Sequence, residues 1–153
     1  MTTQRLTDST ASIRLALQED VESLCAFDHL AQQEDSRRRF IQHAVQAGRC
    51  YLVETRQRVV GYAVLEYTFF EQGFISMLYI HPDYRRRGAG AMLMQHMESL
   101  CRTPKLFTST NLSNCPMQAL LAKRGYILSG VLHHLDEGDP ELVYVKFLER
   151  AGS

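Results

Sequence analysis

Apolar residues recur along the N-terminal half at spacings that predict a strand followed by helices. Residues Ser12 to Leu17 alternate as a strand does, and Gln18-Glu19-Asp20 then supplies acidic side chains suited to a helix start. The buried side of that helix is marked by Val21, Leu24 and Cys25. A second helix is predicted by apolar residues at helical spacing, with Ser36 as N-cap and Gly48 as C-cap: Phe40, Ile41, Ala44 and Val45.

The middle of the chain predicts three consecutive strands. They run over Cys50 to Thr55, Val59 to Phe70 and Phe74 to Ile80. Polar connectors, Arg56-Gln57-Arg58 and Glu71-Gln72-Gly73, separate them. Because connectors this short join antiparallel neighbours, we expect a meander.

The C-terminal part predicts two helices and three strands. Helices are expected over Gly88 to Cys101 and over Asn114 to Arg124, the second closing at Gly125. Strands are expected at the following segments: Lys105 to Thr110, Ile127 to Leu132 and Val143 to Leu148. Since no repeat or second domain is visible, we expect one domain over residues 1–153, with residues 1–11 as a polar tail.

Composition narrows the functional class. The 17 basic and 17 acidic side chains balance, so no overall field draws the chain to nucleic acid or to an anionic membrane. The N-terminus lacks a signal-peptide core, and the longest apolar run is too short to span a membrane. The four cysteines and six histidines show no metal-ligand spacing. We therefore expect a cytoplasmic protein without a metal.

The segment IHPDYRRRGAGAMLM, from Ile80 to Met94, carries the most specific chemistry. Glycines at 88 and 90 open the backbone before a helix whose first N–H groups and dipole both favour an anion. A P-loop is excluded because Ala91-Met92 stands where Lys-Ser/Thr is needed. A dinucleotide fingerprint fits poorly because Leu93 occupies its third glycine position.

The remaining pattern, R-x-x-G-x-G at Arg85, Gly88 and Gly90, resembles the GNAT superfamily of N-acyltransferases. The segment NCPMQALLAKRGY, from Asn114 to Tyr126, matches the family's second motif more loosely. The resemblance implies an α+β, three-layer fold. It also implies a mixed, mostly antiparallel sheet of six to seven strands, about four helices, and two strands that splay apart at a coenzyme A site.

The resemblance also implies roles for particular residues. Backbone groups of Leu78, Tyr79 and Ile80 would bind the pantetheine arm of acetyl-CoA as an added strand would. Asn114 would bind the same arm, although an Asn in that place is equally a helix N-cap. The pyrophosphate would lie against the amides of the turn, with the three arginine side chains near it: Arg85, Arg86, Arg87, Gly88, Ala89, Gly90 and Ala91.

Catalytic residues are less clearly marked, because Leu121 stands where family members usually place a proton-donating tyrosine. Water or a hydroxyl would then protonate the departing thiolate, and the nearby side chains able to do so are Cys115, Ser113, Tyr126 and Tyr79. Glu66 interrupts an apolar strand and could act as a base through water. Alternatively, the side chain of Glu66 simply faces solvent on an alternating strand.

The expected reaction is acetyl transfer from acetyl-CoA to a primary amine of a small molecule or peptide by direct attack in a ternary complex. An acidic turn between the last two strands could attract a cationic amine or be an ordinary polar turn: Asp136, Glu137, Asp139 and Glu141. The alternative function is a non-catalytic acyl-CoA-binding regulatory module. Exposed sheet edges in a small domain are consistent with a homodimer.

Overall fold

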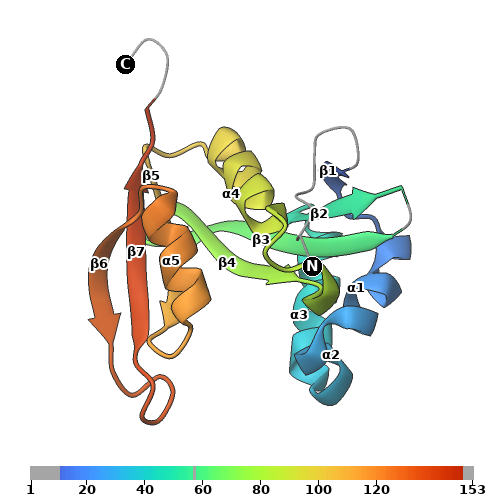
Figure 1. Ribbon diagram of the computed structural model, residues 1–153, viewed down its shortest axis with the longest axis horizontal. Helices are drawn as coiled ribbons and strands as arrows, with labels where there is room; N and C mark the ends of the chain where they lie inside the picture. The colour runs from blue at the N-terminus through green and yellow to red at the C-terminus, as the bar shows by residue number, and fades with distance from the viewer. Residues whose placement is uncertain (1–10, 57, 150–153) are drawn as a thin grey trace. The chain divides into compact units, whose positions relative to one another are not determined.

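The computed structural model describes residues 11–56 and 58–149 (Figure 1). Seven strands occur in chain order: β1 (Ala11–Leu15), β2 (Cys50–Thr55), β3 (Val59–Phe69), β4 (Gln72–Ile80), β5 (Lys105–Asn111), β6 (Ile127–Leu132) and β7 (Glu141–Phe147). The helices are α1 (Val21–Phe27), α2 (His29–Gln33), α3 (Asp35–Gln46), α4 (Ala89–Leu100) and α5 (Cys115–Lys123), with 3-10 turns η1 (Gln18–Asp20) and η2 (Pro82–Tyr84).

The strands form one mixed sheet in the order β1-β2-β3-β4-β5-β7-β6. The pairs β1/β2, β2/β3, β5/β7 and β6/β7 are antiparallel, whereas β4 and β5 are parallel. Within the described part of the chain, four helices have seven residues or more. The predicted fold class, a mixed and mostly antiparallel sheet with about four helices, is therefore confirmed.

Backbone contacts divide the chain into two compact units. One contains the described residues up to Leu65 together with Met77–Met97, and the other contains Glu66–Ser76 with the described residues from Glu98 onward. Each unit is described below by itself. The expectation of a single functional domain stays a prediction.

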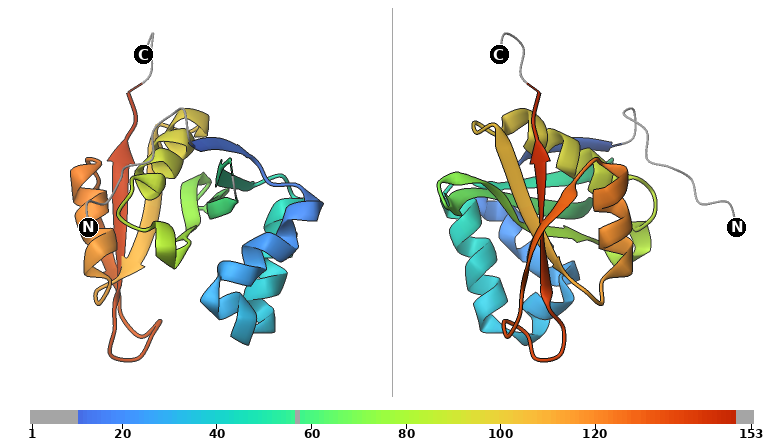
Figure 2. Two further views of the ribbon diagram at one scale, coloured as in Figure 1. Left: turned by 45° about the vertical axis from the view of Figure 1, so that its right-hand side comes forward. Right: turned by 90° about the vertical axis from the view of Figure 1, so that its left-hand side faces the viewer.

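The first unit is built around a core between β2, β3 and the first three helices. Figures 1 and 2 place α1, α2 and α3 on one face of these strands and α4 on the other. Alternating strand residues meet the helices, as the period of a strand requires. The cluster comprises Ala16, Val21, Leu24, Cys25, Ala31, Ile41, Ala44, Val45, Cys50, Leu52, Tyr62 and Val64. It includes every residue from which the first two helices were predicted, apart from Phe40, which packs against it.

A buried carboxylate joins the helices to the sheet inside this core. Asp28 is fully buried and caps α2 by accepting hydrogen bonds from the N–H groups of Leu30 and Ala31. Its other oxygen accepts from Arg37 Nε at 3.0 Å and from the hydroxyl of Tyr62. Burial, with the neighbouring carboxylate, raises the pKa of Tyr62. One side chain thus links α2, α3 and β3.

The second unit has its core on the α5 side of β5 and β7. Leu121 of α5 is fully buried, and Leu106, Thr108 and Leu142 are buried on the strands. Glu98 lies at the edge of this core and accepts hydrogen bonds from Arg124, Tyr126 and Lys146. Figure 2 shows α5 lying along one face of the β5–β7 pair.

Several details differ from the sequence prediction. Strand β1 is Ala11–Leu15 rather than Ser12 to Leu17, so Ala11 belongs to a strand and not to the polar tail. The C-cap of α3 is Ala47 rather than Gly48, which follows it with positive φ. Helix α2 was not expected, because its five residues are too short to show a helical period. Ser36 is not an N-cap, since α3 begins at Asp35 with Glu34 in the cap position. The β3–β4 turn is Phe70-Glu71 rather than Glu71-Gln72-Gly73, and Gly73 lies inside β4, where a Cβ would collide with Cys101 Sγ.

Replacing Asp28 with alanine should lower the free energy of unfolding by about 3 kcal/mol, because it leaves Arg37 without a partner and uncaps α2. Urea unfolding followed by circular dichroism measures this. Glu22→Ala is the matched control, since it removes the ion pair with Arg38 at a side chain that is 79% exposed. The control should leave the unfolding midpoint unchanged, and equal losses in the two variants would contradict the structural role of Asp28.

Candidate functional site

The chain leaves β4 through a rigid corner at His81. This imidazole is buried between Phe27 and Tyr84, with ring centroids 5.4 Å and 5.5 Å away, and its Nδ1 accepts from the N–H of Asp83 at 3.0 Å. Burial lowers the pKa of His81, and the charge of Arg58 lowers it further. The ring is therefore neutral near pH 7 and caps η2.

The backbone then passes through two left-handed residues before α4. Arg86 has φ of +65° and Gly88 has φ of +94°. An added Cβ on Gly88 would meet no atom within 4 Å, so the turn needs glycine for its conformation and leaves open space beside the backbone. Because the N–H of Met92 bonds to the carbonyl of Gly88, the N–H groups of Ala89, Gly90 and Ala91 have no acceptor within the helix.

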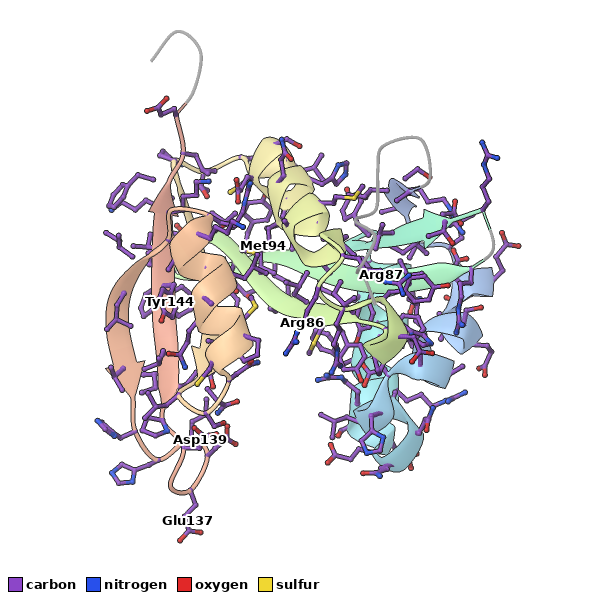
Figure 3. All side chains as sticks on the ribbon, viewed as in Figure 1. Arg86, Arg87, Met94, Glu137, Asp139 and Tyr144 are labelled. Atoms are coloured by element: carbon purple, nitrogen blue, oxygen red, sulfur yellow. The ribbon has the colours of Figure 1, made fainter. Side chains whose placement is uncertain are left out.

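Three arginines directly precede these amides in the chain. Arg85 and Arg86 are exposed and Arg87 is half-buried. The guanidinium of Arg87 lies 5.1 Å from the ring centroid of Tyr84, and that of Arg58 lies 5.6 Å from the same ring. Arg58 was not among the residues predicted for the site; its cation–π contact depends on η2 bringing Tyr84 to it. Figure 3 labels Arg86 and Arg87 beside the start of α4. An anion would meet both amides and formal charge here.

One edge of β4 carries backbone groups suited to an extended ligand. The pairing of β4 with β5 comprises Gly73, Phe74 and Ile75, whereas β4 continues to Ile80. The N–H of His81 bonds to the carbonyl of Val60, so by strand alternation the polar groups of Leu78 and Ile80 point away from β3. The backbone N–H and C=O groups of Tyr79 point toward β3. The carbonyl of Ile80 accepts from Arg85 Nε at 3.1 Å.

The side chain of Tyr79 has surroundings of its own. Its ring stacks on Phe27 and Tyr62, and the Arg85 guanidinium lies 5.4 Å from its centroid. Its hydroxyl oxygen accepts from the N–H of His29, and within the described residues no acceptor takes the hydroxyl proton. Tyr79 therefore has a hydroxyl able to donate, and its sequence neighbours Leu78 and Ile80 carry the backbone groups that point away from β3.

The second motif region starts α5. Asn114 is its N-cap and accepts from the N–H of Met117 at 3.2 Å, so the capping alternative holds, while its contact with the pantetheine arm stays a prediction. Cys115, the first helical residue, is exposed. Leu121 is fully buried, so the side chain in the usual tyrosine position belongs to the core of this unit.

Tyr126 is buried, and its hydroxyl donates to Glu98 Oε2 at 3.1 Å. Burial raises the pKa of Tyr126, and the Glu98 carboxylate raises it further. Its proton is thus held by an internal carboxylate. Glu66 lies on β3 with a half-buried side chain, on the face shared by Tyr62 and Val64.

The acidic turn is partly structural. Asp139 accepts from the N–H of Ser113 at 2.9 Å and from its hydroxyl at 2.5 Å. Asn111 Nδ2 donates to Asp136 Oδ2 at 2.8 Å. These bonds tie the β6–β7 loop to the segment that leads into α5. Glu137 lies at the tip of the loop and points away from the ribbon (Figure 3).

A cavity of about 670 Å³ in the first unit adjoins the His81 corner, and it is lined by α1, the β2–β3 turn and η2. Its lining combines basic Arg56 and Arg58 with acidic Glu54 and Asp83. Within residues 11–56 and 58–149, no group of three or more His, Cys, Asp or Glu side chains is placed to hold a metal ion. None of the helices described in this range is long and apolar enough to cross a membrane.

Comparison with known proteins decides the family. Residues 14–126 match the model of the Acetyltransferase (GNAT) family. The chain belongs to the GNAT family of acetyltransferases. A GNAT-family acetyltransferase from Bacillus cereus ATCC 10987 has a similar crystal structure at 35% sequence identity, with a TM-score of 0.85 over 92% of this chain and 99% of that chain.

Two solved structures of lower identity share the GNAT fold. One is yncA from Salmonella typhimurium with its cofactor acetyl-CoA, at 15% identity, TM-score 0.73, and coverage of 94% and 97% of the two chains. The other is the ribosomal-protein-S18-alanine N-acetyltransferase from Escherichia coli, at 16% identity, TM-score 0.74, and coverage of 94% and 97%. Among curated proteins, none matches significantly.

Replacing Gly88 with alanine should weaken binding of acetyl-CoA at least tenfold, or about 1.4 kcal/mol, because the Cβ disfavours the left-handed turn and fills the open space. Isothermal titration calorimetry measures the affinity. Gly48→Ala is the matched control, since Gly48 has φ of +69° and equally open surroundings at the end of α3. Each variant should lose about 1–2 kcal/mol of stability. An unchanged affinity in folded Gly88→Ala would contradict the assignment of this turn.

Proposed function

We propose that this GNAT acetyltransferase binds acetyl-CoA and transfers the acetyl group to a primary amine of a small molecule or peptide by direct attack in a ternary complex. The observation that carries the proposal is the turn before α4. Three amides without helical acceptors, at Ala89, Gly90 and Ala91, lie beside three arginines and an open space at Gly88. This is the chemistry that a pyrophosphate requires.

The rest of the donor fits the neighbouring backbone. The N–H and C=O groups of Leu78 and the N–H of Ile80 are suited to the amide groups of a pantetheine arm, which would bind as an extra strand does. Arg85 would have to leave the Ile80 carbonyl for that group to bind as well. Asn114 is the further candidate for this arm, alongside its capping role. The structure of yncA with acetyl-CoA supports a donor of this kind in the shared fold.

The proposed reaction needs one proton removed and one supplied. The amine nitrogen forms a bond to the thioester carbonyl carbon, the carbon–sulfur bond breaks, and coenzyme A leaves as a thiolate. The ammonium proton of the acceptor must be lost before attack, and the thiolate must gain a proton. A thiol of pKa about 8.5 is a tolerable leaving group near neutral pH, so water can supply that proton.

Among the side chains, Tyr79 has the hydroxyl best suited to assist water, since none of the residues that the structure describes accepts its proton and the residue lies between Leu78 and Ile80. Cys115 is a second candidate because it is exposed. Tyr126 could donate its proton to the thiolate only after its hydrogen bond to Glu98 breaks. A tenfold loss of kcat in Tyr126→Phe with unchanged stability would identify it as the donor despite that bond.

A thiol-release assay with acetyl-CoA and a panel of primary amines tests the proposed function. We expect turnover on at least one amine, with one acetylated product for each thiol released. The panel should include peptides with N-terminal alanine, because the related enzyme from E. coli acetylates an alanine of a ribosomal protein. Tight binding without turnover on any amine from pH 6 to pH 9 would instead favour the alternative, a regulatory acyl-CoA-binding module.

We propose Glu66 as the base that accepts the ammonium proton, directly or through water. Glu66→Gln should lower kcat/KM at pH 7 by about tenfold or more, with a smaller effect at pH 9, where more of the amine is already neutral. Initial-rate measurements across this range test it. Glu71→Gln, on the exposed β3–β4 turn, is the control and should match the wild type. A loss at pH 7 that persists undiminished at pH 9 would point to a structural role for Glu66.

We also propose that the acidic turn attracts a cationic acceptor. Glu137 is the side chain for this test, because Asp136 and Asp139 are engaged in holding the loop. Glu137→Gln should raise KM for the amine by about two- to threefold at low salt and leave KM for acetyl-CoA unchanged. Equal changes in both KM values would remove the steering role.

A further inference from the structure

The corner at His81 brings two hydrogen-bond donors together with no acceptor between them. Nδ1 of His81 accepts from the N–H of Asp83 at 3.0 Å, so the proton of the neutral ring is on Nε2. Nη2 of Arg58 lies 2.7 Å from that same Nε2. A guanidinium N–H only donates, and a protonated ring nitrogen has no lone pair to accept from it. The two groups are thus within hydrogen-bond distance without forming a hydrogen bond.

The other protonation states of His81 move this conflict rather than remove it. A proton on Nδ1 would face the backbone N–H of Asp83, which belongs to η2 and is held by the turn. A doubly protonated ring would face both donors, and burial, with the charge of Arg58, lowers the pKa of His81 against that form. Arg58 is exposed, so its side chain is the group able to move. An acceptor between Arg58 and Nε2–H would resolve the conflict.

Both donors line the cavity of about 670 Å³ that adjoins this corner. All of its lining residues belong to the first unit. Ligand pockets commonly have volumes of about 300–1,000 Å³. Part of the lining is apolar and would contact a carbon skeleton: Ala26, Phe27, Val59 and Pro82. Since the lining includes no residue of the turn from Arg85 to Ala91, the cavity is distinct from the site proposed for pyrophosphate.

The charged side chains of the cavity indicate which anion it suits. Within residues 11–56 and 58–149, no carboxylate forms an ion pair with Arg58, whereas Glu54 is engaged by Arg14 at 3.0 Å. Asp83 also lines the cavity, and its side chain is 79% exposed. These two acidic side chains would repel a doubly charged phosphate more than a singly charged carboxylate. The two oxygens of a carboxylate can accept from a guanidinium and from an imidazole N–H at the same time.

We propose that this cavity binds a small organic carboxylate, whose oxygens accept from Arg58 and from the Nε2–H of His81. The carboxylate separates the two donors and gives each an acceptor, while the apolar lining contacts the rest of the ligand. The site goes beyond the proposed acetyl transfer, because coenzyme A carries no carboxylate group and no group is transferred here. Its test therefore needs neither acetyl-CoA nor turnover.

Long-range proton–nitrogen correlation spectra of the full chain test the donor arrangement and the ligand together. Without ligand, Nε2 of His81 should be protonated and Nδ1 should not. A panel of small monocarboxylates, dicarboxylates and α-amino acids is then titrated, and at least one member should move the His81 ring signals saturably. Inorganic phosphate at matched ionic strength is the comparison and should bind more weakly. A proton on Nδ1, or saturable shifts with phosphate alone, would overturn the proposal.

Two variants remove one donor each, and the amide signal of Asp83 reports binding in both. Arg58→Met keeps the length of the side chain but loses the guanidinium, so it should weaken carboxylate binding about tenfold or more. His81→Asn loses the Nε2–H but keeps an oxygen able to cap η2, and it should weaken binding by a similar factor. Arg39→Met is the matched control, since Arg39 is exposed on α3 of the same unit, and it should bind as the wild type does.

Repeating the titration in saturating coenzyme A separates this site from that of the acetyl donor. The carboxylate should still bind, because the cavity lining and the turn from Arg85 to Ala91 share no residue. Displacement of the carboxylate by coenzyme A would assign Arg58 to a phosphate of that ligand and overturn the proposal. Failure of every member of the panel to move the His81 signals would overturn it as well, whatever the outcome of the acetyl-transfer assay.

Discussion

Arg85 to Gly88, the last four of the eight residues between β4 and α4, combine a constraint of the fold with the chemistry of the proposed ligand. The chain must reverse after β4 to start a helix, and it does so through left-handed backbone at Arg86 and Gly88. That reversal leaves open space beside the backbone of Gly88, and the first amides of α4, which have no acceptor within the helix, follow directly after it and after three arginines. The affinity proposed for coenzyme A therefore depends on backbone conformation more than on any single side chain, because a helix start without this turn would not expose its amides in the same way.

Several polar residues near the second motif serve the fold, and this limits how they can serve chemistry. Tyr126 donates to Glu98, Asp139 holds Ser113, and Asn114 caps α5. Each group satisfies a polar partner that folding would otherwise leave unpaired. Leu121 completes the pattern, since a buried leucine replaces a polar donor altogether. We therefore propose that proton transfer uses water or a hydroxyl elsewhere, such as that of Tyr79, whose proton no described residue accepts.

Much of the fold could be predicted from the sequence because its strands and longer helices carry clear periods. The bounds of β2 and β6 were predicted as the structure has them, and the stripe of Val21, Leu24 and Cys25 is buried as expected. Helix α2 could not be predicted, because five residues show no period. The Phe70-Glu71 turn was missed because nothing in those residue types favours positive φ.

The geometry of the candidate site was predictable where the local backbone defines it and not where distant side chains meet, and the roles of its residues stay predictions. Gly88 favours a left-handed conformation, so one motif was enough to predict the amide cradle, by which we mean the N–H groups of Ala89, Gly90 and Ala91. The commitment of Asp139 and Tyr126 to internal partners depends on contacts across 26 and 28 residues of sequence, which no local pattern encodes. The orientation of Leu78 and Ile80, opposite to Tyr79, likewise depends on the register of β4 against β3.

The amide cradle at the start of α4 is the central claim, and two-dimensional N–H correlation spectra test it most directly. On titration with acetyl-CoA, the amide signals of Ala89, Gly90 and Ala91 should move downfield and saturate together, as hydrogen bonds to a phosphate require. Saturable binding of acetyl-CoA that leaves these three signals in place would contradict it.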